Sequence, residues 1–191
     1  MPVVHTPVGI LSFPNLFKPR PRSPGADPVY SCSLLFDQAA QRHPLFALMK
    51  KAVDELVDQT WGAGKSQDPK FMARIRSPFR SCSDKDYKGY DIPGGVYISP
   101  WSNNKPGIID ARKQEILVPD DVWPGQLARL TVNPFSYDQP GNPGVNFGLN
   151  NIQVCGPGAE RLDGRKSAAD EFNEYSGPGA GALAGTDADP F

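Results

Sequence analysis

Cationic and aromatic side chains alternate through one stretch of the sequence, residues 71–90. Its cations are Arg74, Arg76, Arg80, Lys85 and Lys88, and the aromatic residues among them include Phe79, Tyr87 and Tyr90. Cations at such intervals can contact successive phosphates, and flat rings can stack on unpaired bases. The stretch therefore has the side chains needed to hold a single nucleic-acid strand without reading its sequence. In the alternative interpretation, Phe71 and Phe79 pack in a core and the cations form a solvated face.

Two further groups of residues fit the same chemistry. Cations alternate with prolines in residues 17–25, namely Lys18, Arg20 and Arg22. We expect an extended basic loop there that clamps a phosphate backbone, with an ordinary exposed hairpin connection as the alternative. Trp101, Phe135 and Tyr137 lie on or beside expected strands, where a sheet surface would present their rings to bases. Core packing is an equally good explanation for Phe135.

The C-terminal tail has the opposite charge. After residue 166 there are five acidic residues and no basic one, and residues 176–186 contain a single large apolar side chain. Ordering such a segment costs about 1–2 kcal/mol per residue with almost no burial in return, so we expect a flexible linker. It ends in an apolar anchor flanked by carboxylates that suits docking to a partner, made by Asp187, Asp189, Pro190 and Phe191. The alternatives are a tail that only aids solubility and one that folds back on the basic body.

Residues suited to catalysis or metal binding are scarce. Of the two histidines, His5 lies near the N-terminus and His43 directly precedes Pro44, where helix capping is the simpler explanation. The three cysteines form no CxxC pair, which argues against a zinc site or a disulfide framework and favours a reducing cytoplasm. The sequence shows no signal-peptide pattern and no apolar run long enough to span a membrane. We therefore expect a cytoplasmic protein that is not an enzyme and that needs no cofactor, metal or membrane.

Short strands and one helix account for the hydrophobic pattern. The helix is expected over residues 44–60, with an apolar face made by Leu45, Leu48, Met49, Ala52, Val53, Leu56 and Val57. Strands are expected over residues 8–13, 29–36, 96–101, 107–110, 127–137 and 145–155. The 191-residue length and this pattern predict a mainly β domain over residues 1–160, followed by a flexible Gly/Ala-rich acidic tail over residues 161–191.

Several stretches between residues 6 and 155 carry a resemblance to a known family. They are residues 6–17, 34–37, 89–90, 125–137, Gly144 and the distinctive run Gly-Leu-Asn-Asn-Ile-Gln at residues 148–153. In these stretches the sequence resembles the phage-encoded single-stranded DNA-binding proteins. The resemblance implies an OB-fold, which is a five-stranded, partly open barrel, with a helix inserted between strands and additional strands outside the barrel.

The resemblance also implies a role and partners. Proteins of this kind coat unwound phage DNA, melt hairpins and promote annealing during replication and recombination in the host cytoplasm. The acidic tip with its terminal Phe191 is similar to tails with which other single-stranded DNA-binding proteins contact a polymerase, helicase or primase. Homo-oligomer formation stays open.

Two other classes of protein remain as alternatives. One is a β-barrel virion or protein-interaction module whose tail docks a partner and whose basic surface does not bind DNA. The other is a metal-dependent nuclease that uses aspartates, with candidates at Asp37, Asp84, Asp86, Asp91, Asp110, Asp120 and Asp121. Aspartates are common in turns, so their spacing alone does not favour the nuclease.

Overall fold

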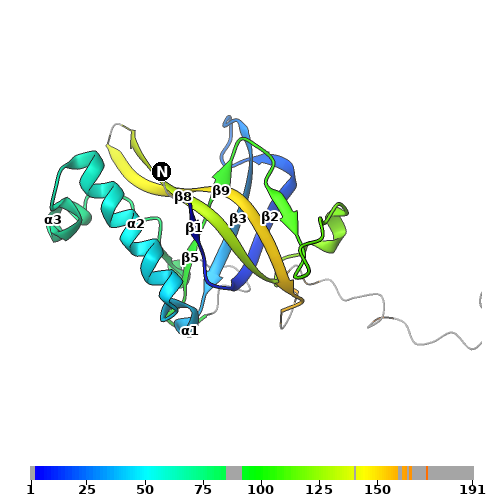
Figure 1. Ribbon diagram of the computed structural model, residues 1–191. Helices are drawn as coiled ribbons and strands as arrows, with labels where there is room; N and C mark the ends of the chain where they lie inside the picture. The colour runs from blue at the N-terminus through cyan, green and yellow to red at the C-terminus, as the bar shows by residue number, and fades with distance from the viewer. Residues whose placement is uncertain are drawn as a thin grey trace, which may run out of the picture.

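The computed structural model describes residues 3–84, 92–139, 141–158, 161, 162, 164 and 171. Its elements are mostly β-strands, arranged beside one long helix (Figure 1). In chain order they are β1 (Val4–His5), β2 (Gly9–Pro21), β3 (Pro28–Phe36), α1 (Gln38–Gln41), α2 (Pro44–Trp61), α3 (Pro69–Met72), β4 (Arg80–Ser81), β5 (Val96–Ile98), β6 (Trp101–Ser102), β7 (Gly107–Ile109), β8 (Leu127–Gln139) and β9 (Asn142–Gly156). Single 3₁₀ turns occupy residues 65–67, 82–84 and 119–121.

Five of these strands close into a barrel. β8 pairs with β2, β2 with β3, β3 with β6 and β6 with β9, and antiparallel pairing of β9 with β8 completes the ring. β1 adds to β8, β7 adds to β9, and β5 and β4 extend the sheet beside β3. The closure makes neighbours of distant residues: Trp101 pairs with Ser31 on one side and with Gly148 on the other.

Helix α2 packs against the barrel beside β1 and β8 (Figure 1). His43 caps its start, because the imidazole Nδ1 accepts a hydrogen bond from the Leu45 amide at 3.1 Å, as the sequence suggests. The predicted phase of the helix needs a correction, since Leu48 is 52% exposed and Phe46 is buried instead. Phe46 sets the phase by packing its ring 5.3 Å from that of Phe36 on β3.

The two short helices are additional to the prediction. Both begin at an aspartate cap: Asp37 accepts a hydrogen bond from the Ala40 amide at 2.7 Å, and Asp68 accepts from Lys70 at 3.0 Å and Phe71 at 3.2 Å. A four-residue helix is too short for a hydrophobic period to show in the sequence.

Strand β2 runs through much of the expected basic loop, which is a second correction. The strand continues to Pro21, which pairs with Pro28, so the connection between β2 and β3 is a hairpin turn over residues 22–27. Prolines fit in this strand because its ladder with β3 is interrupted by register shifts after Ser12 and after Asn15. The remaining expected strands are present with shifted ends, and the one over 96–101 is divided into β5 and β6.

The core fills the barrel and the space under α2. Its fully buried residues include Leu11, Leu34, Met49, Leu130 and Phe147. None of the described helices is long and apolar enough to cross a bilayer. In the described part of the chain, no three His, Cys, Asp or Glu side chains gather as metal ligands would, and two aspartates of the nuclease hypothesis, Asp86 and Asp91, lie outside it.

Candidate nucleic-acid interface

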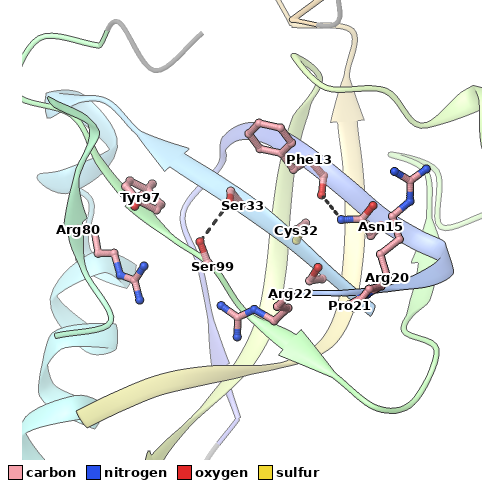
Figure 2. Close-up of a pocket in the computed structure, with 11 residues that line it drawn as sticks. Phe13, Asn15, Arg20, Pro21, Arg22, Cys32, Ser33, Arg80, Tyr97 and Ser99 are labelled. Atoms are coloured by element: carbon pink, nitrogen blue, oxygen red, sulfur yellow. Dashed lines mark hydrogen bonds between the residues drawn. The ribbon is translucent and has the colours of Figure 1, made fainter. Parts of the chain in front are cut away.

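A pocket with three arginines opens on one side of the barrel, between β2, β3, β4 and β5 (Figure 2). Its volume is about 310 Å³, and we call it the arginine pocket. Its lining residues are Phe13, Asn15, Arg20, Pro21, Arg22, Ser31, Cys32, Ser33, Arg80, Tyr97 and Ser99. None of these described lining residues is an aspartate or a glutamate, so among them the arginines have no counterion.

The arginines reach the pocket from separate parts of the chain. Arg20 pairs with Val29 near the end of β2, and Arg22 follows in the hairpin turn. Arg80 lies on β4, where it pairs with Tyr97 of β5. The strand pairings therefore bring the hairpin and β4 to two sides of one hollow, and in Figure 2 the side chains of Arg22 and Arg80 extend into the space between them.

Electrostatic repulsion within the pocket affects Arg22. Partial burial of its guanidinium group and the positive charge of Arg80 lower the pKa of Arg22, and the Tyr137 phenol acts in the opposite direction. Among the described residues the ion pairs are Lys51 with Glu55 and Lys65 with Asp68, and neither includes a pocket arginine. An anion bound between Arg22 and Arg80 would relieve this repulsion.

The floor of the pocket is neutral, and several of its polar side chains are hydrogen-bonded within the protein. Burial raises the pKa of the Cys32 thiol to about 12, so this thiol stays protonated at neutral pH. The hydroxyls of Ser33 and Ser99 are hydrogen-bonded to each other at 3.1 Å, and the Asn15 side-chain amide donates to the Phe13 carbonyl at 3.4 Å. The arginines are therefore the groups best able to bind a ligand there.

Aromatic side chains continue the surface beyond Arg22. The guanidinium carbon of Arg22 lies 5.8 Å from the centroid of the Trp101 ring, and the Trp101 and Phe135 rings pack edge to face with centroids 5.5 Å apart. Tyr137 follows Phe135 by two positions on β8, so both project from the same face of that strand. We call Trp101, Phe135 and Tyr137 the aromatic surface, and all three residues are partly exposed.

A glycine on β9 makes room for Tyr137. Gly144 pairs with Tyr137 across the β8–β9 ladder, and a Cβ atom at Gly144 would lie 2.5 Å from the phenol oxygen and 2.8 Å from the Cβ of Arg76. Arg76 is held beside the same hairpin, since its amide donates to the Pro143 carbonyl at 2.9 Å and its carbonyl accepts from Val145 at 3.0 Å. Gly144 thus allows Tyr137 and Arg76 to lie close together.

Several residues proposed from the sequence lie in or beside this surface, and others do not. Arg20, Arg22, Arg76, Arg80, Trp101 and Tyr137 are brought together as described. Lys18 is exposed on β2 outside the pocket lining, and Arg74 is exposed after α3. Lys85, Tyr87, Lys88 and Tyr90, and the tail residues Asp187, Asp189, Pro190 and Phe191, lie outside the described residues.

Phe79 is partly buried and packs against the core, a placement that does not favour the stacking role proposed for it. Its ring packs 5.3 Å from that of Phe46 and 5.6 Å from that of the fully buried Phe147. The alternative interpretation of the sequence described this residue better, because alternation along the chain turns Phe79 inward while Arg80 faces the pocket.

Phe13 and Tyr97 line the pocket but were not among the proposed site residues. Phe13 looked like one more apolar residue of an expected strand, and only its place before Pro14 hinted at an irregular backbone. The alternation of Ser31 and Ser33 on β3 was the available sign that one face of this strand is polar.

A second hollow of about 390 Å³ crosses β1, β7, β8 and β9. Lys113 and Arg129 lie at this hollow, but its lining includes no aromatic side chain other than His5. The Arg129 guanidinium donates to the Gln153 side chain at 2.7 Å and is partly satisfied within the protein. The arginine pocket is therefore the better candidate for binding a nucleic-acid strand.

Comparison with known proteins agrees with the mainly β, OB-fold-like architecture. The solved structure "Single-stranded DNA-binding protein from bacteriophage Enc34 in complex with ssDNA" matches with a TM-score of 0.68 at 18% identity, over 84% of this chain and 89% of that chain. A second structure, described as "Single-stranded DNA-binding protein from bacteriophage Enc34", matches with a TM-score of 0.61 at 18% identity, over 90% of each chain. The bacteriophage T7 single-stranded DNA-binding protein gp2.5 matches with a TM-score of 0.56 at 13% identity, over 87% of this chain and 98% of that chain.

The fold is thus OB-fold-like, as it is in these phage single-stranded DNA-binding proteins. A family model described as "Enterobacter phage Enc34, ssDNA-binding protein" matches residues 1–180. The chain belongs to this family, as its sequence resemblance implied. No match was found among the curated proteins.

Proposed function

We propose that this protein binds single-stranded DNA, with the arginine pocket on the phosphates and the aromatic surface under the bases. The observation that carries the proposal is the meeting of Arg20, Arg22 and Arg80 in one pocket that adjoins Trp101 and whose described lining residues include no carboxylate. Family membership and the likeness to a relative described as a complex with ssDNA support the same ligand.

The two parts of the surface contribute differently to binding. Four arginines, Arg20, Arg22, Arg76 and Arg80, can each neutralise a phosphate, which predicts a slope of log affinity against log salt of about −2.8 for a single strand. Stacking contributes roughly 1–3 kcal/mol per base, so two stacked bases would supply about 2–6 kcal/mol.

Binding is expected to depend little on base sequence. Reading a base requires free donors and acceptors at fixed positions. The Ser33 and Ser99 hydroxyls bond to each other, and the Asn15 amide bonds to the backbone, so these side chains are already engaged. Aromatic rings can stack on any base, and guanidinium groups can contact any phosphate.

The experiment is a titration of the full-length protein with oligonucleotides, followed by tryptophan fluorescence, at several salt concentrations. We expect binding to oligo(dT) and to a mixed sequence with similar affinity, and a steep loss of affinity with salt. Absence of binding to a long oligonucleotide would reject the proposal and favour a protein-interaction module. Release of short fragments in the presence of Mg²⁺ would favour a nuclease.

We further propose that the protein acts in phage DNA replication and recombination by coating single strands, and that its tail recruits a replication protein. The support is the terminal Phe191 with Asp187 and Asp189 beside it, which fits an apolar pocket with a basic rim. Phe191→Ala should keep oligo(dT) affinity but lose partners in a pull-down from infected cells. Retention of every partner by this variant would refute the recruitment role.

A further inference from the structure

Phe13 has a backbone conformation that side chains rarely adopt. Its φ is 46°, in the left-handed region. Pro14 follows it, and a proline normally holds the preceding residue in an extended conformation. Lys113 is the other non-glycine residue with positive φ in the described part of the chain. Such strain persists only where the surrounding structure enforces it, and it concentrates at functional sites.

A β-bulge imposes this conformation. Ser12 pairs with Ser33 and Asn15 pairs with Ser31, so Phe13 and Pro14 on β2 stand opposite the single residue Cys32 on β3. In bulges whose first residue is left-handed, that residue is normally glycine. Phenylalanine therefore occupies a position for which the backbone favours glycine, and backbone requirements do not explain the ring.

The bulge moves the ring from the core to the pocket. In a regular strand, Phe13 would point to the same side as Leu11, which is fully buried. The side chain of Phe13 is instead 51% exposed and lines the arginine pocket (Figure 2). The chain thus accepts a strained backbone in order to place a half-exposed aromatic ring at the edge of a site for anions.

We infer that Phe13 is a nucleobase-stacking residue, which the bulge holds in place before DNA binds. The inference rests on the proposed function and deepens it. A nucleotide whose phosphate contacts Arg22 or Arg80 would place its base in the pocket that the Phe13 ring also lines, whereas Trp101 lies beside Arg22. The pocket then holds successive nucleotides between two aromatic positions, with the arginines between them.

The test uses three variants of the full-length chain. Phe13→Gly removes the ring and suits the backbone, Phe13→Tyr keeps a ring, and Lys113→Gly relieves the same kind of strain in a turn outside the arginine pocket. Each variant is measured by thermal denaturation and by affinity for oligo(dT). A second oligonucleotide of the same length with abasic sites retains the phosphates but has no bases to stack.

Phe13→Gly is expected to melt at a temperature equal to or above that of the wild type, and to bind oligo(dT) about 5- to 100-fold more weakly. Its affinity for the abasic oligonucleotide should stay within about twofold of the wild type, because the phosphate contacts remain. Phe13→Tyr should bind oligo(dT) as the wild type does. Lys113→Gly should also melt no lower than the wild type, and its change in oligo(dT) affinity should be far smaller than that of Phe13→Gly.

Two results would overturn the inference while leaving the proposed function intact. One is unchanged oligo(dT) affinity of Phe13→Gly when the wild type binds. The other is an equal loss on both oligonucleotides together with a lower melting temperature, which would make Phe13 a packing residue. Failure of the wild type itself to bind oligo(dT) would reject the proposed function and, with it, this stacking role.

Discussion

Replacing Arg22 by alanine is the most informative single change. Arg22 shares the arginine pocket with Arg80, and its guanidinium carbon lies 5.8 Å from the centre of the Trp101 ring. A hydrogen bond between charged groups contributes roughly 1.5–3 kcal/mol, so its loss should weaken binding of oligo(dT) by about 10- to 150-fold. Because burial and Arg80 both disfavour the charge on Arg22 in the free protein, the substitution should not lower the melting temperature.

The salt dependence separates this contact from general attraction. If four arginines each neutralise one phosphate, the slope of log affinity against log salt should change from about −2.8 in the wild type to about −2.1 in Arg22→Ala. Arg22→Lys keeps the charge and should keep the wild-type slope, but it should bind more weakly because it lacks the planar guanidinium group. Arg42→Ala is the matched control, since Arg42 is exposed at the end of α1 and does not line the pocket.

Two outcomes would refute this reasoning. If Arg42→Ala weakens binding as much as Arg22→Ala, the protein attracts DNA by its overall charge and the pocket has no special part. If Arg22→Ala keeps the wild-type slope, Arg22 does not contact a phosphate. The double variant of Arg22 and Arg80 adds a further check: with one phosphate for each arginine, its slope should change further, to about −1.4.

Three further changes test other parts of the molecule. Gly144→Ala should weaken oligo(dT) binding by up to about tenfold, because its Cβ would meet the Tyr137 phenol. The control is Gly156→Ala, which has no atom within 4 Å of its Cβ and should bind normally. Equal affinities of the two variants would show that the position of Tyr137 does not contribute to binding. Burial raises the pKa of Cys32 to about 12, above the value of about 8.5 for an unfolded cysteine. Because the unfolded chain loses this proton more easily than the folded protein, the free energy of unfolding should fall as pH rises from about 9 to 12. The free energy of unfolding, measured by chemical denaturation across this pH range, should fall more steeply for the wild type than for Cys32→Ala. Parallel falls in the two proteins would contradict the raised pKa of Cys32. Deleting residues 176–191 should leave the melting temperature unchanged and tighten oligo(dT) binding at low salt, because the carboxylates no longer compete for the cationic surface; unchanged or weaker binding would contradict this.

Part of the fold was predictable because it depends on local patterns. The helix beginning at Pro44 and the strand ending at Phe36 follow from apolar spacing and from a proline at the first helical turn. The phase of α2 was not predictable from spacing alone, because Phe46 and Leu48 both fit an apolar stripe. The contact of Phe46 with Phe36 on β3 decided between them.

The candidate site was predictable in its chemistry but only partly in its membership. The sequence pointed to arginines and aromatic rings, and the structure gathers several of them around one pocket. It treated residues 71–90 as one continuous binding segment, yet neighbouring residues of this segment separate, with the ring of Phe79 packed against the core and Arg80 lining the pocket. Neither side-chain type nor spacing shows which way each residue of an irregular segment points.

Local sequence by itself determined that this chain forms a β-rich domain with one long helix, an acidic tail, and cations and rings suited to a nucleic-acid strand. The tertiary structure decided which of those side chains act together. Closure of the barrel brings Arg22, Arg80, Trp101 and Tyr137 to one surface from four separate strands or turns, and a single bulge turns Phe13 toward it. Both depend on hydrogen-bonded register between distant strands, which no local pattern in the chain encodes.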